Sequence, residues 1–587
     1  MNKKFIVPIL LIALLSLISY FNVFQNEFVW DDHIFILDNP DIRSLSNLPL
    51  FFSQDTDGLY RPLRSVYYAL VYSFAGKNEF WYHFNSLFLH TAVSILVFFV
   101  VYNIFNKKNI ALVSSLIFAA HPIHTERVTN ITAGFDLLGV FLLLLSFFFY
   151  IKFSKSGAGG HLISSLLLLL LAVFSSEEAI TLPLLIILYE FCFNREKFSN
   201  KHAIIKNIAD NYLPYFIVAI FYLAIRFLVV GLKGRIEEYL AGNFFLTALT
   251  MLKAYVYYIY LLIAPINLTL FHDVKAATAI FDFGVLLSFL ALAAVMFFTL
   301  KYNKNKAVFF PVFWFFITLI PFSNLLPLQV FMAERYLYVP SIAFSLLVSY
   351  AFVSIFNYNF ENNKKIIRNG TAIFIVALLA FYVFSTINRN NDWKDDMVLW
   401  SKTVLTNPNN SRAHDNLGFT YERMGETEKA LHEFGLAVKL QEDDFRALAN
   451  LAVAYAKLGR YNESLIALKK SIEIREYHKT YDKLGLVYDE IGMEEDAIKS
   501  FKEAISLNPR YAKAHNDLGA VYGKTGKFDL ALEEFNKAIR IDRDYADAHF
   551  NKGILLEFLG EKDKANQEFK TAAKLEPKTE MYMQKLK

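Results

Sequence analysis

Residues 5–24, FIVPILLIALLSLISYFNVF, decide the class of fold, because these twenty residues contain no charge. A helix of this length, rising 1.5 Å per residue, spans the roughly 30 Å hydrocarbon core of a bilayer. Lys3 and Lys4 precede the stretch and predict a cytoplasmic N-terminus. No small-residue cleavage site follows, so we expect an uncleaved first span. Asp31 and Asp32 then face the opposite side.

The composition of the whole chain fits a membrane protein. Hydrophobic residues make up 55% of the 587 residues and charged residues only 19%, which is unusual for a soluble domain. The formal net charge of +4 is too small to indicate nucleic-acid binding. The single cysteine, Cys192, excludes a disulfide within the chain.

Further apolar runs predict a bundle of about eleven or twelve spans. The candidate ranges are 5–24, 83–105, 109–121, 135–151, 162–176, 178–194, 212–231, 245–265, 281–300, 307–321, 337–357 and 367–388. Short basic connectors are expected in the cytoplasm, at 106–109, 152–156, 194–202, 301–306 and 362–368. Twelve crossings would place both ends of this membrane part on the same side of the membrane. The basic connectors instead predict a cytoplasmic start and a non-cytoplasmic end, which requires an odd number of crossings. The segment 245–265 is therefore a candidate for a re-entrant helix or for a span with wrongly placed bounds, and the side of 265–273 stays open.

The sequence after Trp393 contains a repeat. Pairs of a large and a small residue recur at steps of 34, 33, 34 and 34, at Leu417-Gly418, Leu451-Ala452, Leu484-Gly485, Leu518-Gly519 and Lys552-Gly553. A glycine, an Ala or Ser, and a large apolar residue follow at the same steps. Five registered copies are the signature of tetratricopeptide repeats. We expect a short helical solenoid whose concave face binds a protein or peptide.

These patterns give an all-α chain with a membrane part and a repeat part. The predicted divisions are a membrane domain at 1–390 with its first outer loop at 25–82, a linker at 391–406, five repeats at 407–580 and a tail at 581–587. The repeats follow the last span, so we expect them on the side of Asp31 and Asp32.

Charged residues gather in the connectors predicted on that side. Asp31 and Asp32 are either solvated loop acids or a general base with a neighbour that orients it, and two close carboxylates raise one pKa. Arg61 and Arg64 either extend to lipid headgroups or grip a phosphate.

Three more clusters have a functional and a structural interpretation. His121, His124 and Glu126 favour a polar cavity wall over a metal site, since Pro122 interrupts the helix that would present both histidines. Glu334 and Arg335 form an internal pair, or Arg335 neutralises a phosphate. Glu177 and Glu178 occupy the tip of a helical hairpin. Such charges near a bilayer indicate function, and no metal or other cofactor is required by these residues.

Five stretches together resemble the transmembrane and tetratricopeptide-repeat O-mannosyltransferases, which have the GT-C glycosyltransferase fold. The stretches are FVWDDHIFILDNPDI (28–42), YRPLRSVYYAL (60–70), HPIHTERVTNITAGFDLL (121–138), SEEAIT (176–181) and AERYLYVPS (333–341). They occur in the family's order and precede the repeats.

The resemblance implies an integral-membrane enzyme that transfers a sugar, often mannose, from a polyprenyl phosphate to Ser or Thr hydroxyls of proteins outside the cytoplasm. It implies that Asp31 is the catalytic base and Asp32 its acidic partner. The remaining candidates, for binding the donor and its phosphate, are Arg61, His121, His124, Glu126, Asp136, Glu177, Glu334 and Arg335.

The chain departs from the family pattern at two positions. Gly134 stands where the family commonly has an arginine, and Ser176 stands where it has a lysine. Two other functions are kept open. One is a transferase that modifies a cell-surface glycan or lipid, and the other is a non-catalytic membrane anchor that displays the repeats. The expected location is a bacterial inner membrane, with lipid, the lipid-linked sugar and an acceptor protein as partners and no nucleic acid.

Overall fold

A computed structural model describes residues 3–56, 58–195, 208–231, 239–240, 242–357 and 364–576. These residues are predominantly helical, and among them the backbone pairing of Thr56 with Leu59 is an isolated bridge outside any strand. The chain divides into two compact units, Met1–Leu399 and Trp400–Lys587. The all-α prediction is therefore confirmed. The predicted tail, 581–587, lies outside the described residues.

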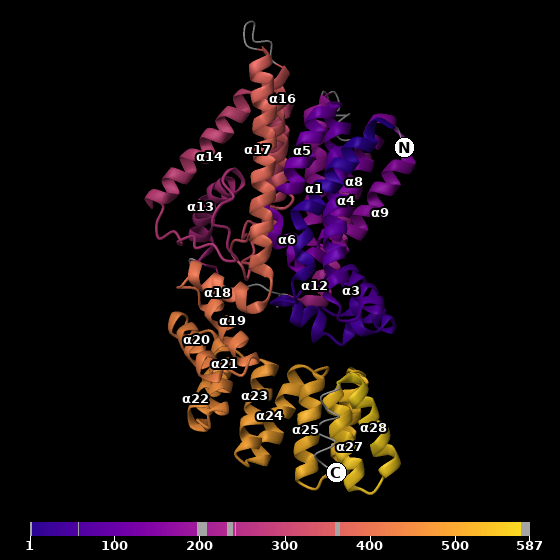
Figure 1. Ribbon diagram of the computed structural model, residues 1–587, viewed down its shortest axis with the longest axis vertical. Coiled ribbons are helices and arrows are strands. Elements are labelled where there is room, and N and C mark those ends of the chain that lie inside the picture. The colour runs from indigo at the N-terminus through magenta and orange to yellow at the C-terminus, as the bar shows by residue number, and fades with distance from the viewer. Residues whose placement is uncertain are drawn as a thin grey trace. The chain divides into compact units, whose positions relative to one another are not determined.

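Each of the twelve predicted spans contains a helix of the first unit (Figure 1). These helices are α1 (Ile6–Tyr20), α4 (Glu79–Phe105), α5 (Lys108–Ala120), α8 (Leu137–Ser156), α9 (Gly159–Ser175), α10 (Leu182–Phe193), α12 (Leu213–Val230), α13 (Phe244–Ile263), α14 (Phe283–Lys301), α15 (Lys306–Thr318), α16 (Ser341–Asn357) and α17 (Lys364–Asn390). By length and composition, seven helical segments of the described chain are long and apolar enough to cross a membrane, and four shorter apolar helices accompany them. The first unit is thus a multi-pass membrane protein.

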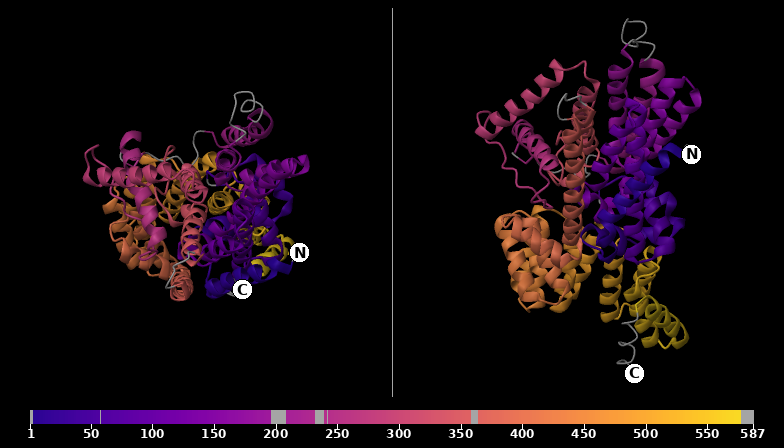
Figure 2. Two further views of the ribbon diagram at one scale, coloured as in Figure 1. Left: turned by 90° about the horizontal axis from the view of Figure 1, so that it is seen from above. Right: turned by 45° about the horizontal axis from the view of Figure 1, so that its top comes forward.

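The centre of this unit is a group of closely packed helices. α1 packs on α4 and α5, and α8 packs on α4 and α9. Figure 1 labels these helices, and Figure 2 shows the indigo-to-purple part of the chain grouped together in two further views. The contact faces of these helices bury apolar side chains such as Val97, Phe118 and Leu143. Between helices in lipid, such close packing of side chains replaces the hydrophobic effect as the source of stability.

Described parts of four connectors predicted to be basic, 106–109, 152–156, 194–202 and 301–306, lie at one end of the bundle. The Lys4 ammonium donates a hydrogen bond to the Tyr102 hydroxyl at 3.5 Å, and Lys155 donates to the carbonyl of Asn103. Arg195 donates to the carbonyl of Asn303 at 3.4 Å. We call this end the basic end.

Short helices occupy the opposite end, which we call the motif end. They are α2 (Leu48–Ser53), α3 (Pro62–Ala75), α6 (Thr125–Thr129), α7 (Ile131–Phe135), the π-helical turn η3 (His33–Leu37) and the 3-10 turns η7 (Glu177–Thr181) and η11 (Glu334–Leu337). The charged stretches singled out in the sequence lie in or next to these elements.

The contacts of α13 answer the question left open about 265–273. The Tyr239 hydroxyl, before α13, donates to the carbonyl of Leu325 at 3.2 Å, and the carbonyl of Leu262, near its end, lies 3.0 Å from His121 Nε2. Both partners belong to motif-end connectors. Beyond α13, His272 lies 3.3 Å from Glu334. The loop 265–273 therefore lies at the motif end, together with the chain on both sides of α13.

The second unit contains the repeats. Its paired helices are α19 (Ser411–Arg423) with α20 (Thr427–Leu440), α21 (Phe445–Lys457) with α22 (Tyr461–Ile474), α23 (His478–Glu490) with α24 (Glu494–Leu507), α25 (Ala512–Lys524) with α26 (Phe528–Ile541), and α27 (Ala546–Phe558) with α28 (Lys562–Leu575). The predicted linker, 391–406, contains η12 (Asn391–Trp393) and α18 (Asp396–Thr406). The division between the units falls within α18.

The spacing of small and large residues explains the repeat geometry. A Cβ atom on Gly519 would lie 2.8 Å from the Phe535 ring, so only a glycine lets α25 approach α26 this closely. The glycine that ends each first helix, such as Gly526 with φ +76°, has the left-handed conformation that favours glycine.

Candidate functional site

Asp32 is fully buried and fixes the first outer loop to α7. Its Oδ1 accepts hydrogen bonds from the backbone amide and the hydroxyl of Thr132, at 2.8 and 2.5 Å, and its Oδ2 accepts one from the Val29 amide at 3.1 Å. Burial raises the pKa of the Asp32 carboxyl to about 7 against the effect of these bonds. Repulsion from Asp31, the cause expected from the sequence, is the last of the contributing causes.

The charge of Asp31 acts on a different residue. The Asp31 side chain is half-buried, and its carboxylate acts on the guanidinium of Arg335. Burial opposes the charge of Arg335, but the carboxylates of Glu126 and Asp31 help to raise the pKa of Arg335 above its usual value. The acid of the first loop and the arginine of AERYLYVPS thus belong to one electrostatic group.

Arg335 is held by α6 and by two aromatic rings. Its backbone amide donates to Glu126 Oε2 at 2.9 Å, and its Nη1 donates to Glu126 Oε1. The guanidinium carbon lies 5.8 Å from the centre of the Trp30 ring and 5.1 Å from that of Tyr336. Glu126 therefore holds Arg335 in place. The sequence had suggested an ion pair between Arg335 and its neighbour Glu334, but the carboxylate that binds Arg335 is that of Glu126.

Glu334 has other partners. Its side chain is fully buried. A carboxylate oxygen of Glu334 lies 3.5 Å from Arg389 of α17, and another lies 3.3 Å from His272. Arg389 also pairs with Asp392 at 2.8 Å. Together with Asp31, Glu126 and Arg335 these residues form what we call the Arg335 group. Arg389 and His272 were missed in the sequence, although a charged residue near the end of an apolar helix is itself a signal.

Asp136 is the centre of a second set of charges. Its oxygens accept hydrogen bonds from Arg61 at 2.8 and 2.9 Å and from Arg64 at 3.2 Å, and Arg127 lies 3.5 Å away. Asp136 is 10% exposed at the side chain. A buried carboxylate shared by three guanidinium groups is a hub that fixes the helices carrying them.

Two glutamates of η7 complete this set. Glu177 accepts from Arg61 Nε at 2.6 Å, and Glu178 accepts from Arg127. We call Arg61, Arg64, Arg127, Asp136, Glu177 and Glu178 the Asp136 group. Its three cations and three carboxylates balance, so Arg61, the predicted phosphate ligand, is engaged by two carboxylates within the protein.

Two glycines bring the members of this group together. A Cβ on Gly139 would lie 2.5 Å from the Cβ of Ser176, and one on Gly134 would lie 2.0 Å from the Ser86 hydroxyl oxygen. The small residue at 139 lets the start of α8 contact Ser176, so Glu177 and Glu178 lie beside Asp136. Gly134 stands where the resembling family has arginine, and the next residue, Phe135, packs its ring on Tyr68 with ring centres 4.1 Å apart.

His121 and His124 are buried structural residues. His121 Nε2 lies 3.0 Å from the Leu262 carbonyl and its Nδ1 accepts from the Ile123 amide at 3.2 Å. His124 Nε2 lies 2.8 Å from the Ser341 hydroxyl. Burial lowers the pKa of His121 to about 4, which keeps the ring neutral. Within the described ranges no set of three or more His, Cys, Asp or Glu side chains could hold a metal ion.

The two groups are joined by α6. Glu126 contacts Arg335 and the next residue, Arg127, contacts Asp136 and Glu178. Adjacent residues of one short helix therefore position both groups. The structure brings every predicted site residue to the motif end: Asp31, Asp32, Glu126, Glu334 and Arg335 around one group, Arg61, Asp136 and Glu177 around the other, and the two histidines beside α6.

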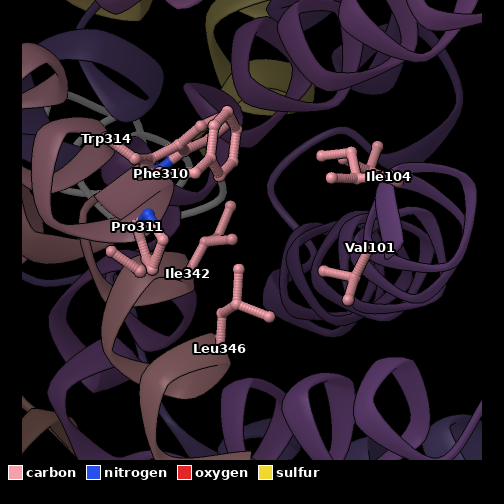
Figure 3. Close-up of a pocket in the computed structure, with 9 residues that line it drawn as sticks. Val101, Ile104, Phe310, Pro311, Trp314, Ile342 and Leu346 are labelled. Atoms are coloured by element: carbon pink, nitrogen blue, oxygen red, sulfur yellow. The ribbon is translucent and has the colours of Figure 1, made fainter. Parts of the chain in front are cut away.

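A small pocket elsewhere in the unit has a different character. It lies between α4, α15 and α16, and nine apolar residues line it, among them Val101, Trp314 and Leu346 (Figure 3). None of these nine side chains carries a charge, so this pocket cannot supply acid, base or phosphate contacts.

Comparison with known families defines the class. Residues 62–209 match the family model described as dolichyl-phosphate-mannose-protein mannosyltransferase. Tetratricopeptide-repeat models match 411–444, 446–476, 485–526, 524–560 and 546–579. The chain therefore combines a segment similar to this mannosyltransferase family with tetratricopeptide repeats, as the resemblance predicted.

Several individual proteins similar to this chain are named protein O-mannosyl-transferases. Protein O-mannosyl-transferase TMTC3 of Mus musculus is 26% identical over 488 residues, covering 76% of this chain and 52% of the relative. Protein O-mannosyl-transferase F38B6.6 of Caenorhabditis elegans is 26% identical over 457 residues, covering 74% and 62%. The chain thus spans about half to three-fifths of these relatives' length. Among solved structures, the tetratricopeptide-repeat protein YrrB is 21% identical, with a TM-score of 0.24, and covers 32% of this chain and 97% of its own.

Proposed function

We propose that this chain is a membrane glycosyltransferase that transfers mannose from a polyprenyl phosphate to hydroxyl groups of proteins outside the cytoplasm. The observation that carries the proposal is that the Arg335 guanidinium lies 5.8 Å from the ring of Trp30, the neighbour of Asp31, although the two loops are about 300 residues apart in the sequence. One supplies a carboxylate base and the other a cation, which are the two groups that transfer from a phosphate donor requires.

The proposed reaction is a direct, inverting displacement. Asp31 accepts the proton of the acceptor hydroxyl while the hydroxyl oxygen attacks the anomeric carbon of the donor sugar. The bond from that carbon to the phosphate oxygen breaks, and its electron pair leaves with polyprenyl phosphate. Arg335, whose side chain is 18% exposed, stabilises the charge on the leaving phosphate. Arg61 would stabilise the leaving phosphate only if that phosphate displaced Asp136 or Glu177 from the Arg61 guanidinium.

Eleven crossings fit the proposed topology. The basic end meets the expectation for cytoplasmic connectors, and the chain on both sides of α13 lies at the motif end. If α13 does not cross, the parity conflict disappears. The motif end and the repeats then face outside the cytoplasm, in a bacterial cell on the outer side of the inner membrane.

We assign the repeats to acceptor binding. Polar side chains connect the first helix of one repeat to the first helix of the next, from α19 to α25. Asn450 donates to Asp415 at 2.9 Å and accepts from Lys483 at 2.5 Å, and Lys513 donates to Asp482 at 2.7 Å. A solenoid with such polar first helices suits a polar, extended peptide.

Sugar transfer by membranes containing the full chain tests the function. The assay supplies polyprenyl-phosphate mannose with a radiolabelled sugar and a Ser/Thr-rich peptide. Asp31→Asn should lower transfer by at least about 100-fold, whereas Asp38→Asn, an exposed acid of the same loop, should leave it unchanged. Full transfer by Asp31→Asn would remove the base assignment. No transfer by the wild type, with donor and acceptor varied, would favour the membrane-anchored scaffold, and transfer only to glycan or lipid would favour that alternative.

A further inference from the structure

The turn that carries Asp31 has a backbone conformation that needs external support. Trp30 has φ +53°, in the left-handed region that bulky residues rarely adopt. Such a conformation persists only where surrounding contacts hold it, and it is found most often at functional sites.

One carboxylate supplies contacts on both sides of Asp31. The Trp30 amide donates to Asp396 Oδ1 at 2.9 Å, and His33 Nε2 lies 2.7 Å from Asp396 Oδ2. Asp396 thus holds the residue before Asp31 by its backbone and the residue after Asp32 by its side chain. Its own side chain is only 12% exposed, which limits competition from water.

Two further hydrogen bonds hold the chain just before Trp30 against the end of α17 and the residues that follow it. The Glu27 amide donates to the Lys394 carbonyl at 2.8 Å, and the Asn26 side chain donates to the Asn390 carbonyl at 3.0 Å. On the other side of the turn, Asp32 is fixed to Thr132. Asp31 therefore lies between two anchors, one made by Asp396 and one made by Asp32.

We propose that Asp396 is a positioning residue for Asp31. By fixing Trp30 in its left-handed conformation, Asp396 sets the direction of the Asp31 carboxylate relative to Arg335, whose guanidinium lies over the Trp30 ring. That Asp31 acts as a base rests on the proposed function, whereas the positioning itself does not depend on it.

A labelling experiment measures the position of residue 31 without any catalysis. Cys192 is the only cysteine and is buried, so Cys192→Ala with Asp31→Cys carries one reactive thiol. We expect Asp396→Ala in this background to change the rate of modification by a charged thiol reagent at least about fivefold. Ser46→Cys, at an exposed position of the same loop, should react at an unchanged rate.

The conservative variant separates positioning from a loss of folding. Asp396→Asn keeps an acceptor for the Trp30 amide and should leave the labelling rate within twofold of that with aspartate. In the transfer assay, Asp396→Ala should lower kcat at least about tenfold with KM for the donor within twofold, and Asp396→Asn should retain most of kcat. An unchanged labelling rate in Asp396→Ala overturns the inference. An altered rate in a protein whose wild type transfers no sugar upholds the positioning and overturns the proposed function instead.

Discussion

The carboxylate of Glu126 accepts hydrogen bonds from both the backbone amide and the guanidinium of Arg335, which is 209 residues further along the chain. The glutamate is 1% exposed and the arginine 18%. A pair this buried is costly to break from one side, because the remaining charge loses its partner without regaining water.

Glu126→Gln should therefore lower the free energy of unfolding by about 3 kcal/mol, measured by thermal or denaturant unfolding in detergent. The double variant with Arg335→Gln should lose at least about 1 kcal/mol less than the sum of the two single variants, because the pair is coupled. Glu27→Gln, an exposed acid of the first loop, is the matched control and should be neutral. Additive losses would contradict the pairing.

Asp136→Asn should be more damaging than Glu177→Gln. Asp136 neutralises three arginines at 10% exposure, whereas Glu177 pairs with one arginine of the described residues, Arg61, at 22% exposure. Removing the hub takes away the carboxylate that pairs with Arg64 and leaves Arg61 and Arg127 with one carboxylate each, at a cost of about 3 kcal/mol or more. Unfolding of the two variants side by side measures the difference, and equal costs would show that Asp136 is not the hub.

Gly139→Ala should disturb the Asp136 group from a distance. The added methyl would lie 2.5 Å from the Ser176 side chain, so α8 and the chain before η7 must separate. We expect a loss of about 1–3 kcal/mol, as for overpacked cores. Gly160→Ala, where a Cβ meets no atom within 4 Å, is the control. Equal stability of the two variants would exclude the close approach.

The buried carboxyl of Asp32 should make stability depend on pH. Burial raises its pKa in the folded chain to about 7, from 3.8. Because the folded pKa is the higher one, the stabilisation from protonated Asp32 is present below about pH 4 and is lost as the pH rises toward 7. Asp32→Asn cannot titrate, so its stability should fall less between pH 5 and pH 8 than that of the wild type. Parallel pH profiles would contradict this prediction.

Two glycines of α25 should respond in opposite directions. Gly519→Ala places a methyl 2.8 Å from the Phe535 ring, whereas a Cβ on Gly523 meets no atom within 4 Å. The first change should destabilise the repeats by about 1–3 kcal/mol, and the second should stabilise them by up to about 1 kcal/mol, because alanine favours helix. Unfolding of the full chain, followed by helical circular dichroism, distinguishes them. The same sign for both would refute the repeat geometry.

Local pattern explains why much of the fold was predictable. The uncharged run at 5–24 predicts a helix from hydropathy alone, and the step from Gly485 to Gly519 predicts a helical pair from spacing alone. Each signal depends on neighbours within one or two helices. The candidate acids and arginines were visible because charge is rare in such a chain.

The partners of those charges were not predictable. Arg335 pairs with Glu126 instead of the adjacent Glu334. Arg389, near the end of α17, contacts Glu334, and Asp396, after α17, contacts Trp30. The hydrophobic periodicity within one helix does not indicate which helix ends come together in the folded chain.

The sequence by itself determined the helices, the repeat register and the set of charged residues placed between spans, since these follow from hydropathy, helical periodicity and residue size. Only the tertiary structure decided that Glu126 and Arg127 serve separate groups, that α13 has motif-end contacts on both sides, and that Asp396 holds the Asp31 turn. The physical reason is that such pairs form between segments hundreds of residues apart, and their identity depends on how closely packed helices bring their ends together.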